Sequence, residues 1–155
     1  MKELELNKNQ ILEYQQNRDP YLMIDYATKV IPGKSSEGYK ILKESEWFFK
    51  VHWPGDPNMP GMLQTEALVQ MSALIIQTMP GYKGKTLYLV NADNLKFIKK
   101  IIPGDKLKIF SNLVSWKRGL MKFEAEGYVG KNKACKANFT LILPGSIDLK
   151  IKKLL

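Results

Sequence analysis

A chain of 155 residues and 17.8 kDa has room for one compact domain, and two halves of this length would each lack a sufficient core. Hydrophobic residues make up 45% of the chain and charged residues 25%, which excludes a disordered tail, a collagen-like rod and a disulfide-stapled miniprotein. The chain has one cysteine, Cys135, so it cannot form an intrachain disulfide. One cysteine and one histidine are also too few for a Cys/His zinc cluster. We expect one domain over residues 1–155, located in the cytoplasm, because the first ten residues lack the apolar run of a signal peptide.

The net charge of +9 is concentrated in the second half of the chain. Residues 1–82 carry 8 basic and 10 acidic side chains, whereas residues 83–155 carry 16 and 5. Such asymmetry is compatible with an acidic partner, which could be nucleic acid, an anionic membrane or an acidic protein. On charge alone, a solvated lysine-rich surface without a partner is the favoured interpretation. Only one arginine, Arg118, lies in the basic half, which argues against nucleic acid because its readers commonly use arginine forks. For the tail over 147–155, a solvated end is favoured over contact with a membrane.

The first third of the chain predicts short elements followed by a stiff loop. A weak apolar pattern predicts a helix over 3–15, which ends before Pro20 because proline disfavours helix at the preceding residue. Residues rich in strand formers then predict three strands, over 21–31, 37–42 and 47–52. Residues 54–61 contain three prolines and two glycines, which predicts a stiff irregular loop.

A long helix and four long strands are predicted after this loop. Residues 62–79 contain neither proline nor glycine and are apolar on most sides, which is typical of a buried helix. A membrane span is disfavoured because Glu66 lies in this stretch. Turn residues separate the strands predicted over 87–97, 106–117, 120–129 and 134–143. One helix packed against a long antiparallel sheet is an α+β fold, and the exposed face of such a sheet predicts a homodimer.

Two polar residues stand out in this apolar setting. His52 ends a predicted strand, and Glu66 lies in the predicted buried helix, where a carboxylate needs a partner or an elevated pKa. Gln70, at position i+4, is placed to orient that carboxyl group by a hydrogen bond. The backbone N–H of Gly61, at the helix start, is suited to hold an oxyanion. A protonated carboxyl group beside a neutral imidazole would form a matched acid and base near neutral pH.

The segment around these residues resembles the active-site segment of bacterial 3-hydroxyacyl-[acyl-carrier-protein] dehydratases. It reads FKVHWPGDPNMPGMLQTEALVQ over residues 49–70, with 14 positions from His52 to Glu66 and 9 from His52 to Gly61. The resemblance continues through DNLKF at 93–97, PGD at 103–105 and KRGLMKF at 117–123, and covers about residues 17–143. It implies the hot-dog fold, in which an antiparallel sheet wraps a central helix and two protomers pair into one continuous sheet.

The resemblance also implies a reaction, in fatty-acid synthesis or in a specialised acyl or polyketide pathway. His52 would remove the α-proton of a 3-hydroxyacyl thioester. Glu66 of the other protomer would protonate or position the departing hydroxyl group, directly or through water. Gly61 would hold the thioester carbonyl, and Gln70 would orient Glu66. No metal and no organic cofactor is expected.

The implied partners are an acyl-carrier protein and further copies of this chain, as a homodimer or a trimer of dimers. Because carrier proteins are acidic, we expect Lys96, Lys99, Lys100 and Arg118 to ring the mouth of a substrate tunnel. Coenzyme A as the carrier, the acyl length and the pathway stay open. A hot-dog thioesterase and a noncatalytic acyl-thioester binding module are the alternative functions.

Three positions depart from the pattern of the dehydratases. The early strand begins with NRDPY at 17–21 rather than with His-Arg-x-Pro-Phe. Trp53 stands where phenylalanine is common, and no proline follows Ile98-Lys99-Lys100. None of these changes removes a proposed catalytic group.

Overall fold

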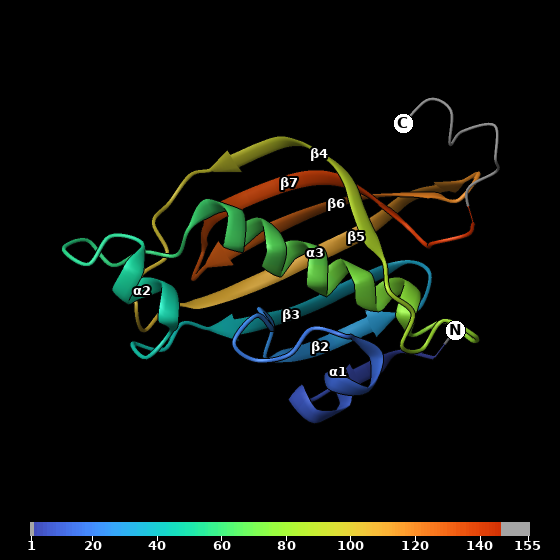
Figure 1. Cartoon of the computed structure of the whole chain (residues 1–155), viewed down its shortest axis with the longest axis horizontal. Helices are drawn as coiled ribbons and strands as arrows, with labels where there is room; N and C mark the ends of the chain where they lie inside the picture. Colours follow the sequence, from blue (N-terminus) through green and yellow to red (C-terminus); the bar gives the residue numbers. More distant parts are fainter. Residues whose placement is uncertain (1, 147–155) are drawn as a thin grey trace.

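The computed structural model describes residues 2–146. Its elements are, in chain order, β1 (Leu4–Leu6), α1 (Lys8–Tyr14), β2 (Tyr26–Ile31), β3 (Ser35–Ile41), α2 (Trp47–Val51), α3 (Gly61–Gln77), β4 (Tyr88–Phe97), β5 (Lys106–Lys117), β6 (Leu120–Val129) and β7 (Asn132–Ile142). The strands form one seven-stranded sheet in the order β1-β2-β3-β5-β6-β7-β4, and every neighbouring pair is antiparallel. Figure 1 shows this sheet curving around α3, which confirms the α+β prediction.

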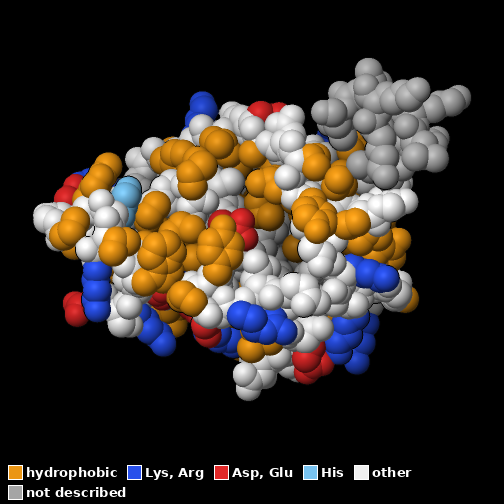
Figure 2. All heavy atoms as spheres, in the orientation of Figure 1, with side chains coloured by type: hydrophobic (Ala, Val, Ile, Leu, Met, Phe, Trp, Pro, Cys, Tyr) orange, Lys and Arg blue, Asp and Glu red, His pale blue; other side chains and the backbone are white. Residues whose placement is uncertain are grey.

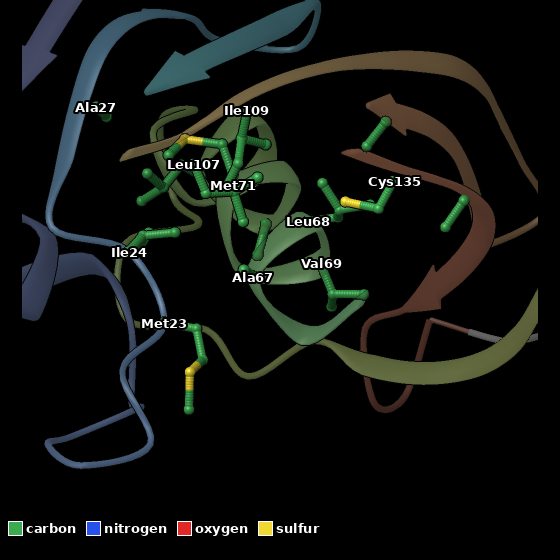
Figure 3. Packing of buried hydrophobic residues seen from close by; sticks show 14 of the residues in the cluster. Met23, Ile24, Ala27, Ala67, Leu68, Val69, Met71, Leu107, Ile109 and Cys135 are labelled. Carbon is green, nitrogen blue, oxygen red and sulfur yellow. The ribbon is translucent and has the colours of Figure 1, made fainter. Parts of the chain in front are cut away.

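Helix α3 is the centre of the core. Thirteen of its seventeen residues are buried, and it contacts strands β2 to β7. The inward-facing residues of β5, among them Leu107 and Ile109, lie against Met71 of α3 (Figure 3). A helix that is apolar on nearly every side is stable only when buried on nearly every side, and the wrapped sheet provides that burial.

The prediction of a strand over 47–52 is wrong, because this segment forms helix α2. Phe48 and Phe49 are adjacent, yet both are buried in the core. A strand would send neighbouring side chains to opposite faces, and one of these rings would then lose its burial. Burying a phenylalanine contributes about 1.5–3 kcal/mol, so the pair outweighs the strand propensity of the sequence.

The predicted helix over 3–15 is only partly correct. Residues Leu4–Leu6 instead pair with β2, and α1 begins after Asn7. The side chain of Asn7 accepts a hydrogen bond from the backbone N–H of Gln10, whose own side chain accepts from the N–H of Asn7. This capping box starts the helix at a defined residue and leaves the preceding residues free to pair as a strand.

The other predicted elements agree with the structure to within a few residues, except that the strand over 21–31 is confined to Tyr26–Ile31. In the described range 2–146, no helix is long and apolar enough to cross a membrane. The tail over 147–155, for which a solvated end was expected, lies outside the described residues.

Strand β4 is an edge of the sheet and is exposed along most of its length. It carries several exposed apolar side chains, Tyr88, Leu89, Val90 and Phe97. Figure 2 shows hydrophobic side chains gathered on this face, over β4 and the first turns of α3. An apolar edge strand with unpaired backbone groups is a template for pairing with another strand.

Candidate active site

His52 lies at the C-terminal end of α2, where its N–H donates to the carbonyl of Phe48 at 2.8 Å. Its ring stacks on Trp53, with centroids 4.4 Å apart. The ring nitrogen Nδ1 lies 3.1 Å from the backbone carbonyl oxygen of Asn58. Because a carbonyl oxygen can only accept, this contact assigns a proton to Nδ1, and in the neutral ring the lone pair then lies on Nε2. In the neutral ring, Nε2 is therefore the one nitrogen with a free lone pair.

The loop that supplies this carbonyl is held from both sides. The N–H of Met59 donates to the carbonyl of Ile101 at 2.8 Å, and Gln64 of α3 donates its Nε2 to the carbonyl of Met59 at 2.9 Å. The side chain of Asn58 donates to the carbonyl of Asp56 at 2.7 Å. Asn58 and Gln64 were not predicted as site residues. The proline-rich composition indicates a stiff loop, but the group that orients His52 is a backbone carbonyl, for which no side-chain signal exists.

Glu66 is half-buried on α3, and its carboxylate accepts a hydrogen bond from Nε2 of Gln70 at 2.8 Å, as predicted. Burial raises the pKa of Glu66 above its usual value of 4.5, and the hydrogen bond from Gln70 opposes part of this rise. The amide of Gln70 also donates to the carbonyl of Tyr21 at 2.9 Å and accepts from the N–H of Met23 at 2.7 Å. These bonds fix which end of the amide faces Glu66. The site thus holds a carboxyl group that keeps its proton to a higher pH than an exposed glutamate.

Gly61 is the first residue of α3, where backbone N–H groups have no partner within the helix. A methyl group at this position would meet the ring of Phe97 at 3.0 Å, so the aromatic ring lies directly against the helix start. His52, Gly61 and Phe97 line one pocket of about 350 Å³. The candidate base and the candidate oxyanion donor therefore face the same space.

Glu66 lines a different pocket, also of about 350 Å³, together with Gln70 and with Tyr88 and Leu89 of β4. The pocket of His52 touches the opposite end of β4, at Phe97. Within one chain, the structure thus places His52 and Glu66 in two pockets at the two ends of the same edge strand.

The four predicted partner-binding residues do not form one cluster. Lys99 and Lys100 line the pocket of His52, and Lys100 pairs with Asp56 at 2.5 Å. Lys96 lies one residue before Phe97, so its side chain projects from the opposite face of β4. Arg118 lies in the turn between β5 and β6, at the Tyr88 end of the sheet. One chain therefore brings only two of the four to the pocket of His52.

A sheet wrapped around one central helix is the hot-dog fold, which solved structures confirm for this chain. The dehydratase heterocomplex ApeI:P from Xenorhabdus doucetiae superposes with a TM-score of 0.75 at 12% sequence identity. The match covers 93% of this chain and 95% of that chain.

Sequence similarity narrows this class to a family. The FabA-like domain matches residues 16–138, and the chain belongs to this family of dehydratases. The 3-hydroxyacyl-[acyl-carrier-protein] dehydratase FabZ of Alkaliphilus metalliredigens is 39% identical over 140 residues, which cover 90% of this chain and 95% of that protein. The FabZ dehydratase of Pediococcus pentosaceus is 38% identical over 147 residues, which cover 95% and 98%.

Proposed function

We propose that this chain converts 3-hydroxyacyl thioesters on acyl-carrier protein into trans-2-enoyl thioesters, as a step of fatty-acid synthesis in the cytoplasm. The observation that carries the proposal is the fixed tautomer of His52, which leaves Nε2 free to act as a base beside the start of α3. Family membership and the 14-residue spacing to Glu66 support the same reaction.

In this mechanism, Nε2 of His52 takes the proton from C2 of the acyl chain. Negative charge then develops on the thioester oxygen, and the N–H of Gly61 at the positive end of α3 stabilises it. The bond between C3 and its hydroxyl oxygen breaks as Glu66 supplies a proton, so the hydroxyl group leaves as water and the C2–C3 double bond forms. The raised pKa of Glu66 suits it to this role, because the group must be protonated when the substrate binds.

We further propose that β4 pairs with β4 of a second copy and that each active site is shared. Antiparallel pairing about the middle of β4 would set the Phe97 end of one copy beside the Tyr88 end of the other. The pocket of His52 would then meet the pocket of Glu66 from the second copy. The exposed apolar side chains of β4 support this pairing, because they would be buried by it.

Acyl-carrier protein is the proposed partner at the pocket of His52. Lys99 and Lys100 at this opening would attract an acidic surface, and the excess of basic residues in the second half of the chain supports that attraction. Lys96 and Arg118 would contribute only to the long-range field of one chain, because neither lines this pocket.

The reaction is tested by following the absorbance of the enoyl thioester when a short 3-hydroxyacyl thioester on carrier protein is added. We expect the natural protein to equilibrate the two forms, and His52→Ala and Glu66→Gln to lose at least about a hundredfold in kcat. Glu126→Gln is the matched control, since this carboxylate lies on β6 in an exposed pair with Lys133. Release of free thiol without loss of the hydroxyl group would instead identify a thioesterase, and tight binding without turnover a binding module.

The shared site is tested by mixing the two inactive variants, His52→Ala and Glu66→Gln, under conditions that exchange protomers. Half of the dimers would be mixed, and each mixed dimer would contain one intact site, so about a quarter of the natural activity should return. A site built within one chain predicts no recovery. Leu89→Lys on β4 should yield monomers in sedimentation, whereas Val114→Lys, on the exposed part of β5, should not.

A further inference from the structure

Lys40 places a positive charge on the inner face of the sheet. Side chains of β3 alternate, and Ser36, Gly38 and Lys40 face inward, where Lys40 stands opposite the fully buried Leu107 of β5. The side chain of Lys40 is only 5% exposed, and its ammonium group lies 2.9 Å from a carboxylate oxygen of Glu46, whose side chain is 16% exposed. Of the ion pairs within residues 2–146, this is the only one in which both side chains are mostly buried.

The carboxylate of this pair stands immediately before α2. Glu46 is the N-cap residue of α2, yet its side chain makes no capping hydrogen bond and instead accepts from Lys40. Helix α2 has five residues, far fewer than a helix needs to be stable alone, so tertiary contacts must hold it in place. Figure 1 shows α2 at the end of the sheet, beyond β3.

Burial and directional contacts hold α2, and one directional contact is the hydrogen bond from Nε1 of Trp47 to the carbonyl of Pro20 at 3.3 Å. Phe48 and Phe49 anchor it by burial, which is favourable over a range of orientations because the hydrophobic effect is not directional. The hydrogen-bonded ion pair is directional, and it joins one atom of β3 to one atom before α2. The aromatic pair therefore keeps α2 against the core, the exposed bond of Trp47 ties it to the loop before β2, and the buried ion pair sets its distance from the sheet.

The position of α2 determines where the histidine ring stands. His52 follows α2 directly, and its N–H is bound to the carbonyl of Phe48 within the helix. A displacement of α2 would therefore carry the ring away from the carbonyl of Asn58, which fixes its tautomer, and from Gly61 across the pocket. An error of about 1 Å in the placement of a catalytic group can cost about a hundredfold in rate.

We propose that the buried Lys40–Glu46 pair is a positioning device for His52, which holds α2 so that the imidazole keeps its reactive nitrogen toward the substrate. Neither residue lines the pocket of His52, so both act through α2. The inference rests on the proposed function, in which His52 is the base.

The test compares two single variants with a double variant. Glu46→Gln and Lys40→Met each leave a buried charge without its partner, and we expect kcat to fall about 10- to 100-fold with KM changed less than about threefold. The double variant Lys40→Met/Glu46→Leu replaces the pair by apolar groups, which commonly restores stability. We expect it to recover the midpoint of thermal unfolding while kcat stays at least about tenfold low. Glu126→Gln, which breaks the partly exposed pair with Lys133 on β6, should leave kcat unchanged.

A second measurement does not depend on the reaction. The chain has one histidine, so the imidazole nitrogens of His52 are identified without ambiguity in a nitrogen-15 spectrum. We expect the Nδ1–H tautomer alone in the natural protein and a mixture of tautomers in the single and double variants. Glu46→Asp, which keeps the charge and shortens the side chain by one methylene, provides the same comparison with less risk of unfolding.

The proposal is overturned if the double variant regains both stability and natural kcat, because packing alone would then place α2. It is also overturned if every variant keeps the single tautomer. A natural protein that dehydrates no thioester would refute the proposed function, whereas a mixture of tautomers in the variants would still support the positioning of His52.

Discussion

The hydrogen bonds of Gln70 allow a prediction that connects stability with acid–base chemistry. Substitution by methionine keeps the length of the side chain and removes all three bonds, to Glu66, to the carbonyl of Tyr21 and to the N–H of Met23. Met23 is fully buried, so its N–H is left without a partner, whereas Tyr21 is exposed enough for water to replace the lost donor.

The expected loss of stability follows from these environments. An unsatisfied buried N–H costs about 1–3 kcal/mol, and each ordinary hydrogen bond contributes about 0.5–1.5 kcal/mol. We expect the free energy of unfolding to fall by about 2–4 kcal/mol, which lowers the unfolding midpoint of a domain of this size by about 5–15 °C.

The substitution also changes the response to pH. The bond from Gln70 lowers the pKa of Glu66, so its removal raises that pKa further above 4.5. Glu66 then keeps its proton to a higher pH in the folded state than in the unfolded chain. The free energy of unfolding therefore decreases as pH rises from the unfolded pKa through the folded pKa of Glu66. The loss in the free energy of unfolding of Gln70→Met should therefore be larger at pH 7 than at pH 4.5. In the proposed mechanism Glu66 is the acid, so the alkaline limb of kcat/KM should move to higher pH.

Circular dichroism melts at the two pH values, together with a pH–rate profile, measure both effects. Gln77→Met is the matched control on the same helix and in the same pocket, because Gln77 is similarly buried but its amide donates to the carbonyl of Lys85 and not to Glu66. We expect it to lose about 1 kcal/mol and to keep the natural pH profile. An alkaline limb that stays in place in Gln70→Met would refute the role given to this amide.

Three further predictions follow from single contacts. In Gly61→Ala, the new methyl group meets the ring of Phe97 at 3.0 Å, and we expect kcat to fall about tenfold. Thermal stability should not fall, because alanine favours helix. Adding Phe97→Ala should restore part of the rate. Lys99→Glu should lower kcat/KM about tenfold for carrier-bound substrate at low salt and weaken its salt dependence, whereas Lys34→Glu, in the turn after β2, should not. Burial raises the pKa of Cys135 to about 12. This thiol should therefore react with a disulfide reagent only as fast as the protein unfolds. Rapid labelling of the native protein would contradict the packing of β7.

Much of the fold could be predicted because the chain marks its own boundaries. Strands β5 and β6 have the predicted ends, since turn residues stand at each end and the residues between them alternate between buried and exposed. The long helix was equally clear from an uninterrupted apolar stretch. The wrong prediction at α2 has the opposite cause. Two adjacent buried rings match neither the two-residue period of a half-buried strand nor the regular spacing of an amphipathic helix, so tertiary packing determined that this segment is helical.

In the candidate site, too, some contacts could be predicted from the sequence and others could not. The bond between Glu66 and Gln70 could be predicted, because residues four apart on a helix are neighbours. The carbonyl of Asn58 and the ion pair of Lys40 with Glu46 could not, since one involves backbone and the other joins a strand to a later helix. Sequence patterns show the chemistry of side chains within one element better than the contacts that hold separate elements in register.

The exposed edge strand connects the two halves of the proposed mechanism. A chain that needed only its own residues for catalysis would gain nothing from an apolar edge, and such an edge carries a risk of aggregation. Here the proposed base and the proposed acid face pockets at opposite ends of β4, so pairing of β4 with a second copy would cover the edge and complete two sites at once. On this proposal, activity requires assembly, and the specific activity should fall on dilution as dimers dissociate, while each dissociated chain keeps the helix α3 buried in its own sheet. A specific activity that stays constant after sedimentation shows monomers would refute the shared site.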